Sequence, residues 1–453
     1  MSNRRTRWDR LQHQYRTIRD CLEGSDAVKD QGQLYVPKPS AMQSQDYQAY
    51  LQRGHFTGAP QMTLRALTGL ALRKDPVIKL PSRLEPWRLA AGHDNAPLSI
   101  LIEKITREVL CMGRHGILLD FPIDGTTSLT LPHITTFRAE DIEDFSTAYV
   151  NGKKVLTKVI LGADEDYDGR DVKYELTLET GVYQFQRFYR DEDKTRVDFG
   201  ETVIPMVNGR SLDYIPFWMV SHEGLQPDDV TPPFYALCQA ALAHLATSCD
   251  KRHALHQTAA PTPYIIGSIA SDKVPTAIGA GALWSLPEGA ECGLLEFTGA
   301  GIAAMKEEMK ELENEMVSAG ARMLSTTINR NETHETASQR TRSELSLLHG
   351  AVVNVEAALN QIVRTAAEWV GANQDEAQIS LSRDFIEASM DPRMIEAQMK
   401  LYLGGMISRA TLHENLQRGE VMRADVTWED EKDRIEEDGG DVSSIIPRPQ
   451  PEE

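Results

Sequence analysis

The chain has 453 residues, of which 41% are hydrophobic and 25% are charged, a composition typical of folded globular proteins and sufficient for two or three compact domains or one elongated subunit. Its net charge of −19 excludes tight binding of nucleic acid over the whole surface, because such binding needs Lys and Arg to neutralise phosphates. It does not exclude a protein that DNA merely passes.

The N-terminal stretch "MSNRRTRWDRLQHQYRTIRD" carries six arginines but lacks the apolar core of an export signal. No run of eighteen apolar residues occurs, so we expect no membrane insertion and a protein that stays in a cytoplasm. The five cysteines lack C-x-x-C spacing, which is typical of thiols in a reducing compartment. We expect the arginines, and the acidic "WEDEKDRIEEDGGD" near the C-terminus, to be solvated.

Residues 1–230 have the pattern of a mixed α and β region. Helical periodicity covers 99–113, whereas β-branched and aromatic residues predict strands at 115–122 and 153–163 and a meander at 171–190.

Three long helices with different connections dominate the rest of the chain. Pro232 and Pro233 suit the first turn of a helix that spans 231–260 and that Pro261 and Pro263 end. Residues 261–299 then predict short strands and turns, too few to form a core of their own.

The second helix is predicted over 300–324 and the third over 337–370, with a polar segment between them at 325–336. Methionines at helical spacing in the second helix indicate packing rather than a cofactor site. The third helix has a heptad-like apolar seam: Leu345, Leu348, Val352, Val355, Leu359, Ile362, Ala366 and Trp369. Glu356 lies between seam positions, and we expect it on a solvated face. A strand within "AQISLSRDF", a helix–turn–helix region and the acidic tail follow, the last two within 391–453.

The second helix opens with a possible dinucleotide-binding turn, Gly299-x-Gly301-x-x-Ala304. A Rossmann unit would need a parallel strand after this helix, with an acidic residue at its end. Here the helix runs into the polar "STTINRNETHET" instead. The context therefore argues against a nucleotide cofactor.

No pattern commits the chain to catalysis or to a metal. His244, His253 and His256 have no acidic or Cys partner at ligand spacing, which favours surface or interface histidines, and His334-Glu335 is not followed by x-x-His. The phosphate-binding G-x-x-x-x-G-K-[ST] loop and the nucleophile motif G-x-S-x-G are both absent. We therefore expect no enzyme, no metal and no cofactor.

The order of parts and several local stretches resemble the portal proteins of tailed bacteriophages, in particular a podovirus-type branch classed as a domain of unknown function. The stretches are "LYVPKPS", "LTGLALRKDP", "GILLDFP", "PTPYIIG" and "NETHETASQRT". The resemblance covers about residues 30–425 and leaves out the N-terminal stretch and the acidic tail.

The resemblance implies an α+β portal fold assembled as a ring. Its parts would be a wing (1–230), a first stem helix (231–260), a β clip (261–299), a second stem helix (300–324), a channel loop (325–336), a long wing helix and strand (337–390) and a C-terminal helical crown with the acidic tail (391–453).

The same resemblance implies a function. Such rings have twelve subunits, occupy one vertex of the capsid in the virion after assembly in the host cytoplasm, and pass double-stranded DNA during packaging and ejection. Their partners are the terminase large subunit, which carries the ATPase, the head-to-tail adaptor, and the major capsid or scaffolding protein.

The residues expected to serve this function fall into three groups. Glu307, Glu311 and Glu315 would face the channel, where an acidic wall repels the DNA backbone and lets a duplex slide. Gly299 and Gly301 would allow a sharp turn from the clip into the stem. The channel loop would present Thr327, Asn329, Arg330, Asn331 and His334.

Two other readings of the chain remain open. A nucleotide-dependent enzyme would bind its cofactor in solution. A helical scaffold or adaptor protein would form a monomer, a dimer or a filament rather than a closed ring.

Overall fold

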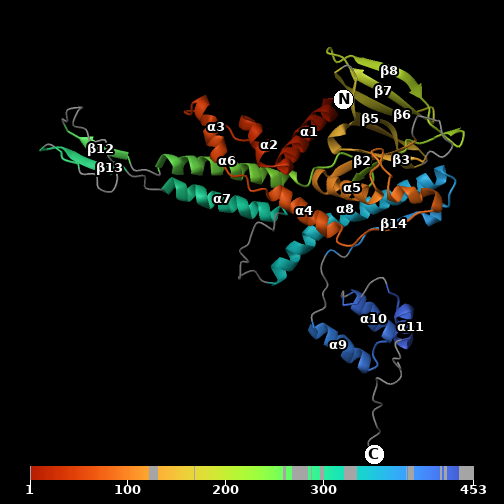
Figure 1. The fold of residues 1–453 in the computed structure, drawn as a ribbon. Coiled ribbons are helices and arrows are strands. Elements are labelled where there is room, and N and C mark those ends of the chain that lie inside the picture. Colours follow the sequence, from red (N-terminus) through yellow and green to blue (C-terminus); the bar gives the residue numbers. More distant parts are fainter. Residues whose placement is uncertain are drawn as a thin grey trace, which may run out of the picture. The chain divides into compact units, whose positions relative to one another are not determined.

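A computed structural model describes residues 2–121, 131–150, 152–167, 169–258, 262–267, 284–286, 288–295, 300–320, 334–383, 385, 392–418, 421–422 and 426–437. The chain forms two compact units, Met1–Arg383 and Asp384–Glu453. Helices combine with antiparallel sheets (Figure 1), so the expected α+β class is confirmed.

The first unit contains helices α1 to α8 and all the named strands. The helices are α1 (Ser2–Glu23), α2 (Ser25–Asp30), α3 (Ser44–Arg53), α4 (Ala59–Ala71), α5 (Leu98–Met112), α6 (Tyr235–Thr258), α7 (Ala300–Ser318) and α8 (His334–Trp369). The strands are β1 (Val77–Lys79), β2 (Arg114–Asp120), β3 (His133–Phe137), β4 (Ile142–Val150), β5 (Lys153–Tyr167), β6 (Arg170–Glu179), β7 (Val182–Arg190), β8 (Arg196–Val203), β9 (Met206–Val207), β10 (Arg210–Ser211), β11 (Phe217–Ser221), β12 (Thr262–Ile266), β13 (Glu291–Leu295) and β14 (Gln378–Ser380).

The core of this unit lies where α5, the β11-β2-β3 sheet and α8 meet. Apolar residues recur around α5 so closely that nearly all of its second half is buried, and Gly113 ends the helix with a left-handed φ of 84°. Strand β2 follows directly and is buried except at its last residue. The helix predicted over 99–113 and the strand predicted over 115–122 are confirmed within one residue or two.

A five-stranded antiparallel meander in the order β4-β5-β6-β7-β8 forms the second layer of the body. It contains the strands predicted at 153–163 and 171–190. Its inner face packs toward β3, where the ring of Tyr174 meets Phe137 edge-on with ring centroids 6.4 Å apart. Phe137 in turn meets Phe217 of β11 edge-on at 6.1 Å.

Helix α8 buries the predicted seam. Leu348, Val352, Val355 and Leu359 are all buried, as are the later seam positions Ile362, Ala366 and Trp369. The side chain of Leu345 lies outside the described part of the helix. Ala351, Ala358, Val363 and Ala367 are buried as well, so the helix is enclosed on more than a narrow seam.

The expectation for Glu356 is wrong. Its side chain is only 17% exposed. One carboxylate oxygen accepts a hydrogen bond from the backbone N–H of Leu381 at 2.8 Å, and the other accepts one from Arg383 at 2.9 Å. Asn360, one turn later, exchanges two hydrogen bonds with the backbone of Ile379 in β14. These polar contacts fix the short β1–β14 pair on the helix.

The basic N-terminal stretch forms α1, in which Arg7, Arg10 and Arg16 are exposed as expected, whereas other side chains of the helix are buried. Tyr15, Ile18 and Cys21 are buried. Arg19 donates two hydrogen bonds to the Glu108 carboxylate, at 2.7 and 2.6 Å, and two to the Glu140 carboxylate, at 2.8 and 3.1 Å. A bidentate pair of this kind satisfies a half-buried guanidinium, so α1 is an integral part of the body.

The second unit contains α9 (Pro392–Leu403), α10 (Arg409–Arg418) and α11 (Trp428–Glu437). The predicted helix–turn–helix region corresponds to α9 and α10. The acidic stretch was expected as a solvated tail, but its first part forms α11, and the Trp428 ring lies 5.8 Å from His413. Its remainder lies outside the described residues.

Candidate functional site

The candidate site is the pair formed by α6 and α7, with strands β12 and β13 between them in chain order (Figure 1). His244 in the first half of α6 meets Glu313 in the second half of α7, so the helices run antiparallel. Met309, Leu312 and Met316 form the buried ridge of α7. Burial of such side chains contributes about 1.5–3 kcal/mol each, so this ridge holds the pair together.

Helix α6 is anchored in the body by the end of α3 and the segment after it. A Cβ at position 54 would lie 2.3 Å from Sγ of Cys249 and clash with it, so only glycine fits at this position. The backbone N–H of His55 donates to Ser248 at 3.0 Å, and the hydroxyl of Tyr50 donates to Asp250 at 2.7 Å. Beyond Asp250 the helix is half-buried or exposed.

The histidines of α6 have different surroundings. His244 is 2% exposed, and its Nε2 lies 3.6 Å from the Glu313 carboxylate. Burial lowers the pKa of His244, against the opposing effect of Glu313, so the imidazole is neutral at pH 7. The ring of His253 packs edge-on against Tyr50 at 5.5 Å, and His256 is exposed. The reading as surface or interface residues is therefore wrong for His244.

Among the described residues, no group of three His, Cys, Asp or Glu side chains is placed to hold a metal ion. In the same part of the chain no helix is both long and apolar enough to cross a lipid bilayer.

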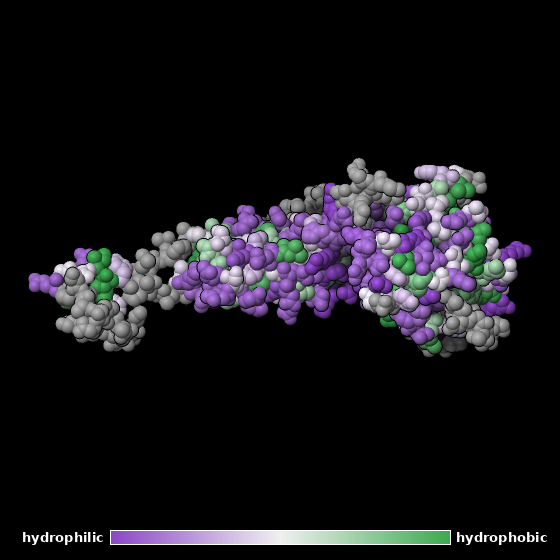
Figure 2. All heavy atoms as spheres, turned by 90° about the horizontal axis from the view of Figure 1, so that it is seen from above, coloured by the Kyte–Doolittle hydropathy of each residue, from purple (hydrophilic) through white to green (hydrophobic). Residues whose placement is uncertain are grey.

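The three glutamates expected to face a channel are exposed on α7. Glu307 and Glu311 point away from the buried ridge, and Glu315 lies to one side of it. Figure 2 shows mostly hydrophilic side chains over the visible face of the helix pair. Whether these carboxylates line a channel stays a prediction.

The predicted glycine turn is only partly within the described residues. Gly299 lies outside them. Gly301 is the second residue of α7, and a Cβ there would meet no atom within 4 Å. Gly301 therefore does not form the expected sharp turn, because its backbone is helical and has room for a side chain.

The predicted channel loop is shorter than expected. His334 is the first residue of α8, so the last three residues of the 325–336 segment belong to the helix. Thr327, Asn329, Arg330 and Asn331 lie outside the described residues. Helix α7 also ends early, at Ser318, and Gly320 follows with a φ of 112° that favours glycine.

Strands β12 and β13 form an antiparallel ribbon in which Tyr264 faces Gly293 and Ile266 faces Glu291. A Cβ at Gly293 would lie 2.7 Å from the Tyr264 hydroxyl oxygen, so glycine makes room for that ring. Tyr264 and Ile266 are 45% and 61% exposed. A two-stranded ribbon of this size is marginally stable by itself.

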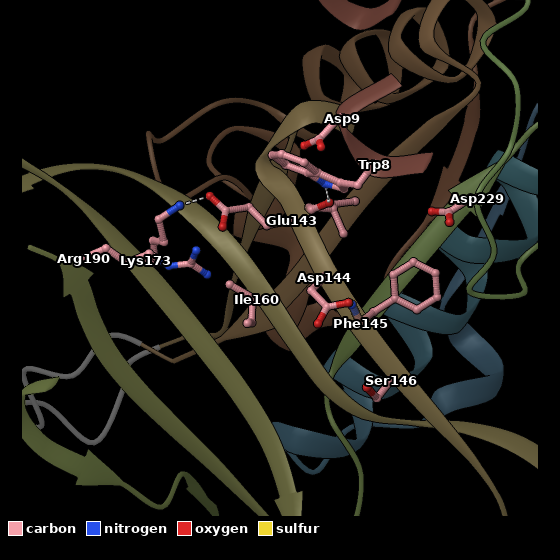
Figure 3. A pocket seen from close by; sticks show the side chains of 11 residues that line it. Trp8, Asp9, Glu143, Asp144, Phe145, Ser146, Ile160, Lys173, Arg190 and Asp229 are labelled. Carbon is pink, nitrogen blue, oxygen red and sulfur yellow. Dashed lines mark hydrogen bonds and ion pairs between the residues drawn. The ribbon is translucent and has the colours of Figure 1, made fainter. Parts of the chain in front are cut away.

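A separate cavity of ≈ 530 Å³ lies between the start of α1 and the meander (Figure 3). The indole N–H of Trp8 donates to the Ile142 carbonyl at 3.4 Å, and Lys173 forms an ion pair with Glu143. Burial, with a smaller effect from Arg190, lowers the pKa of Lys173 to about 8. No periodicity or motif in the sequence indicates this cavity, because its lining comes from α1, the meander and Asp229.

Comparison with known proteins gives a family match and matches to solved structures, two of which are described here. Residues 233–370 match the family "Domain of unknown function (DUF4055)". One structure, from the "Neck of native GTA particle computed with C12 symmetry", has 14% identity and a TM-score of 0.44, and the match covers 86% of this chain and 98% of that chain. Another, from the "Virion of native gene transfer agent (GTA) particle", has 15% identity and a TM-score of 0.43, covering 87% and 99%. No curated protein sequence matches.

Proposed function

We propose that the protein is a portal protein, a subunit of a ring at one capsid vertex. The ring is dodecameric by the sequence resemblance. It forms the channel for packaging and ejection of double-stranded DNA and is the docking site for the terminase and the head-to-tail adaptor. It contacts the major capsid or scaffolding protein during assembly in the host cytoplasm and stays in the virion.

The observation that carries this proposal is the order and packing of α6, the β12–β13 ribbon, α7 and α8. Two antiparallel helices share a buried ridge, a small β ribbon connects them, and a third, longer helix enters the body core. These elements correspond in order to the stem, the clip and the wing helix implied by the resemblance. The matched family region, 233–370, begins and ends within two residues of this stretch.

The charge of α7 supports passage of DNA rather than its capture. The helix carries five glutamates and two lysines, and Glu307, Glu311 and Glu315 are exposed. In a ring of such helices Glu307, opposite the buried ridge, would present repeated carboxylates to the phosphate backbone. Repulsion keeps the duplex mobile, whereas a ring of Lys and Arg would bind it through counterion release.

Negative-stain microscopy of the purified full-length protein tests the proposal. We expect closed rings with a central channel, and an assembly mass many times the 50.6 kDa of one chain. A monomer, a dimer or an open filament as the sole species would contradict the proposal and favour the scaffold or adaptor reading.

The enzyme reading is tested separately by calorimetry with NAD and with ATP. The only sequence feature that favours it is the Gly299-x-Gly301 turn. We expect no heat of binding from either nucleotide. A saturable signal would contradict the non-enzymatic assignment.

A further inference from the structure

We propose that neighbouring subunits join through two oppositely charged edges of the α6–α7 pair, the acidic edge of one copy facing the basic edge of the next. This inference rests on the proposed ring and names the surface that closes it. The acidic edge is Glu308, Glu311 and Glu315 on α7. The basic edge is Lys306 and Lys310 on α7 together with Lys251 on α6.

The helical positions of α7 separate the two edges. With the ridge at Met309, Leu312 and Met316 facing α6, a turn of about 100° per residue places Glu308 and Glu315 on one flank and Lys306 and Lys310 on the other. Glu311 adjoins the acidic flank. All five charged side chains are exposed, so they are available to a second copy of the chain.

Helix α6 extends the basic edge. Glu313 lies on the lysine side of α7 and approaches His244. Lys251 is seven residues after His244, on the same face of α6, and its charge contributes to the lowered pKa of His244, after burial and His55. Both ring nitrogens of His244 are buried without a hydrogen-bond partner among the described atoms.

The arrangement of charges is unfavourable for an isolated helix. Glu308 and Glu311 are three residues apart, and Glu311 and Glu315 are four apart, so like charges are neighbours on one flank. Lys306 and Lys310 repeat this on the other flank. A solvated helix gains stability when the signs alternate at these spacings.

Contacts within the chain relieve the lysine flank in part and leave the acidic flank unrelieved. Lys310 approaches Glu307 at 3.9 Å. By contrast, Glu308, Glu311 and Glu315 form no ion pair with any residue that the structure describes. A neighbouring copy that places its lysines against these carboxylates would relieve the repulsion on both flanks at once.

A head-to-tail interface is the symmetry that such edges require. When two different surfaces of one chain are complementary, each copy binds the next, and the series closes into a ring if the rotation allows it. Two copies joined by identical surfaces would instead place acid against acid. The charge pattern therefore favours a second copy of the chain, bound head to tail, as the binding partner of these edges.

Charge reversal in the full-length protein tests the inference. Variant A carries Glu308→Lys, Glu311→Lys and Glu315→Lys, and variant B carries Lys251→Glu, Lys306→Glu and Lys310→Glu. Each alone should need at least about tenfold more protein to form rings, because one interface becomes repulsive. An equimolar mixture should form rings again, since the lysine edge of A then meets the glutamate edge of B. A protein that carries both sets of reversals should also assemble.

The controls separate the possible failures. Glu368→Lys reverses an exposed charge on α8, outside both edges, and should leave assembly unchanged, and circular dichroism checks that every variant keeps its helices. Rings of A and of B at wild-type concentrations, or no recovery in the mixture of folded A and B, would overturn the inference and leave the proposed function standing. If the wild type itself forms no ring, the proposed function fails, and the edge interface fails with it.

Discussion

At the scale of single residues, polar side chains of α8 stabilise the fold through hydrogen bonds that their positions in the sequence do not indicate. Glu356 looks like one of several charged residues between apolar positions. Its carboxylate instead accepts the backbone N–H of Leu381, a buried residue 25 positions later. An N–H that loses its acceptor in a buried place costs about 1–3 kcal/mol. The ion pair to Arg383 adds little, because Arg383 is half exposed.

Replacement of Glu356 by Ala should therefore lower the free energy of unfolding by about 1–3 kcal/mol. Glu368→Ala is the matched control, because Glu368 lies on the same helix and its side chain is exposed. We expect a change within about 0.5 kcal/mol for it. Urea denaturation of both variants measures the difference. Equal effects would show that the contact between Glu356 and Leu381 does not stabilise the body.

At the scale of elements, the long helices follow from local periodicity, but their ends and polar contacts do not. The seam of α8 repeats so regularly that its buried face could be read from the sequence. The early end of α7, the helical His334 and the burial of α1 could not, because helix ends depend on a few local contacts and α1 is buried by partners such as Glu108 and Glu140.

The same distinction applies to the candidate site. The exposed Glu307, Glu311 and Glu315 follow from their positions relative to the methionine ridge, because both lie on one helix. The buried His244 could not be identified from sequence. Its burial depends on α7 and on the segment around His55, which lie far away in the chain.

The seam of α8 should dominate the stability of the first unit. Leu348 and Leu359 are both buried, and truncation of a buried Leu to Ala costs about 2–5 kcal/mol. The double change Leu348→Ala and Leu359→Ala should therefore remove a large part of the free energy of unfolding, which is about 5–15 kcal/mol for a typical protein. We expect a sharply lower melting temperature and soluble yield, and fewer rings.

The control for the seam is the double change Arg364→Ala and Glu368→Ala, which alters two exposed residues of the same helix. It should leave the melting temperature nearly unchanged. If the leucine variant melted like the wild type, the burial of this face would contribute far less than its packing indicates.

At the scale of the whole molecule, the pH dependence of stability combines groups with opposite behaviour. Burial lowers the pKa of His115 and of His133 to about 4, and burial raises the pKa of Asp120 to about 6. In the unfolded chain a histidine binds its proton below about pH 6.5, whereas both folded histidines stay neutral down to about 4. Above pH 6.5 these histidines do not change the free energy of unfolding with pH. As the pH drops from 6.5 toward 4, only the unfolded chain binds their protons, so the free energy of unfolding falls.

Asp120 acts in the opposite direction over most of this window. Its folded form holds a proton below about pH 6, whereas the unfolded carboxylate binds one only near pH 3.9. Its contribution therefore grows as the pH falls from 6 to 4. The total curve reports only the sum, so a variant is needed to isolate one group.

His115→Leu removes the clearest of these groups, because His115 is fully buried and neither of its ring nitrogens has a hydrogen-bond partner among the described atoms. A one-proton difference changes the free energy of unfolding by up to about 1.4 kcal/mol per pH unit. The variant should therefore lose up to about 3 kcal/mol less than the wild type between pH 6.5 and 4. Urea unfolding at pH 7, 6, 5 and 4 gives the two curves, and His115→Gln, which is also neutral throughout, should flatten the curve in the same way. Parallel curves for the wild type and both variants would mean that His115 binds its proton equally well in the folded and unfolded chain, which contradicts the effect expected from its complete burial.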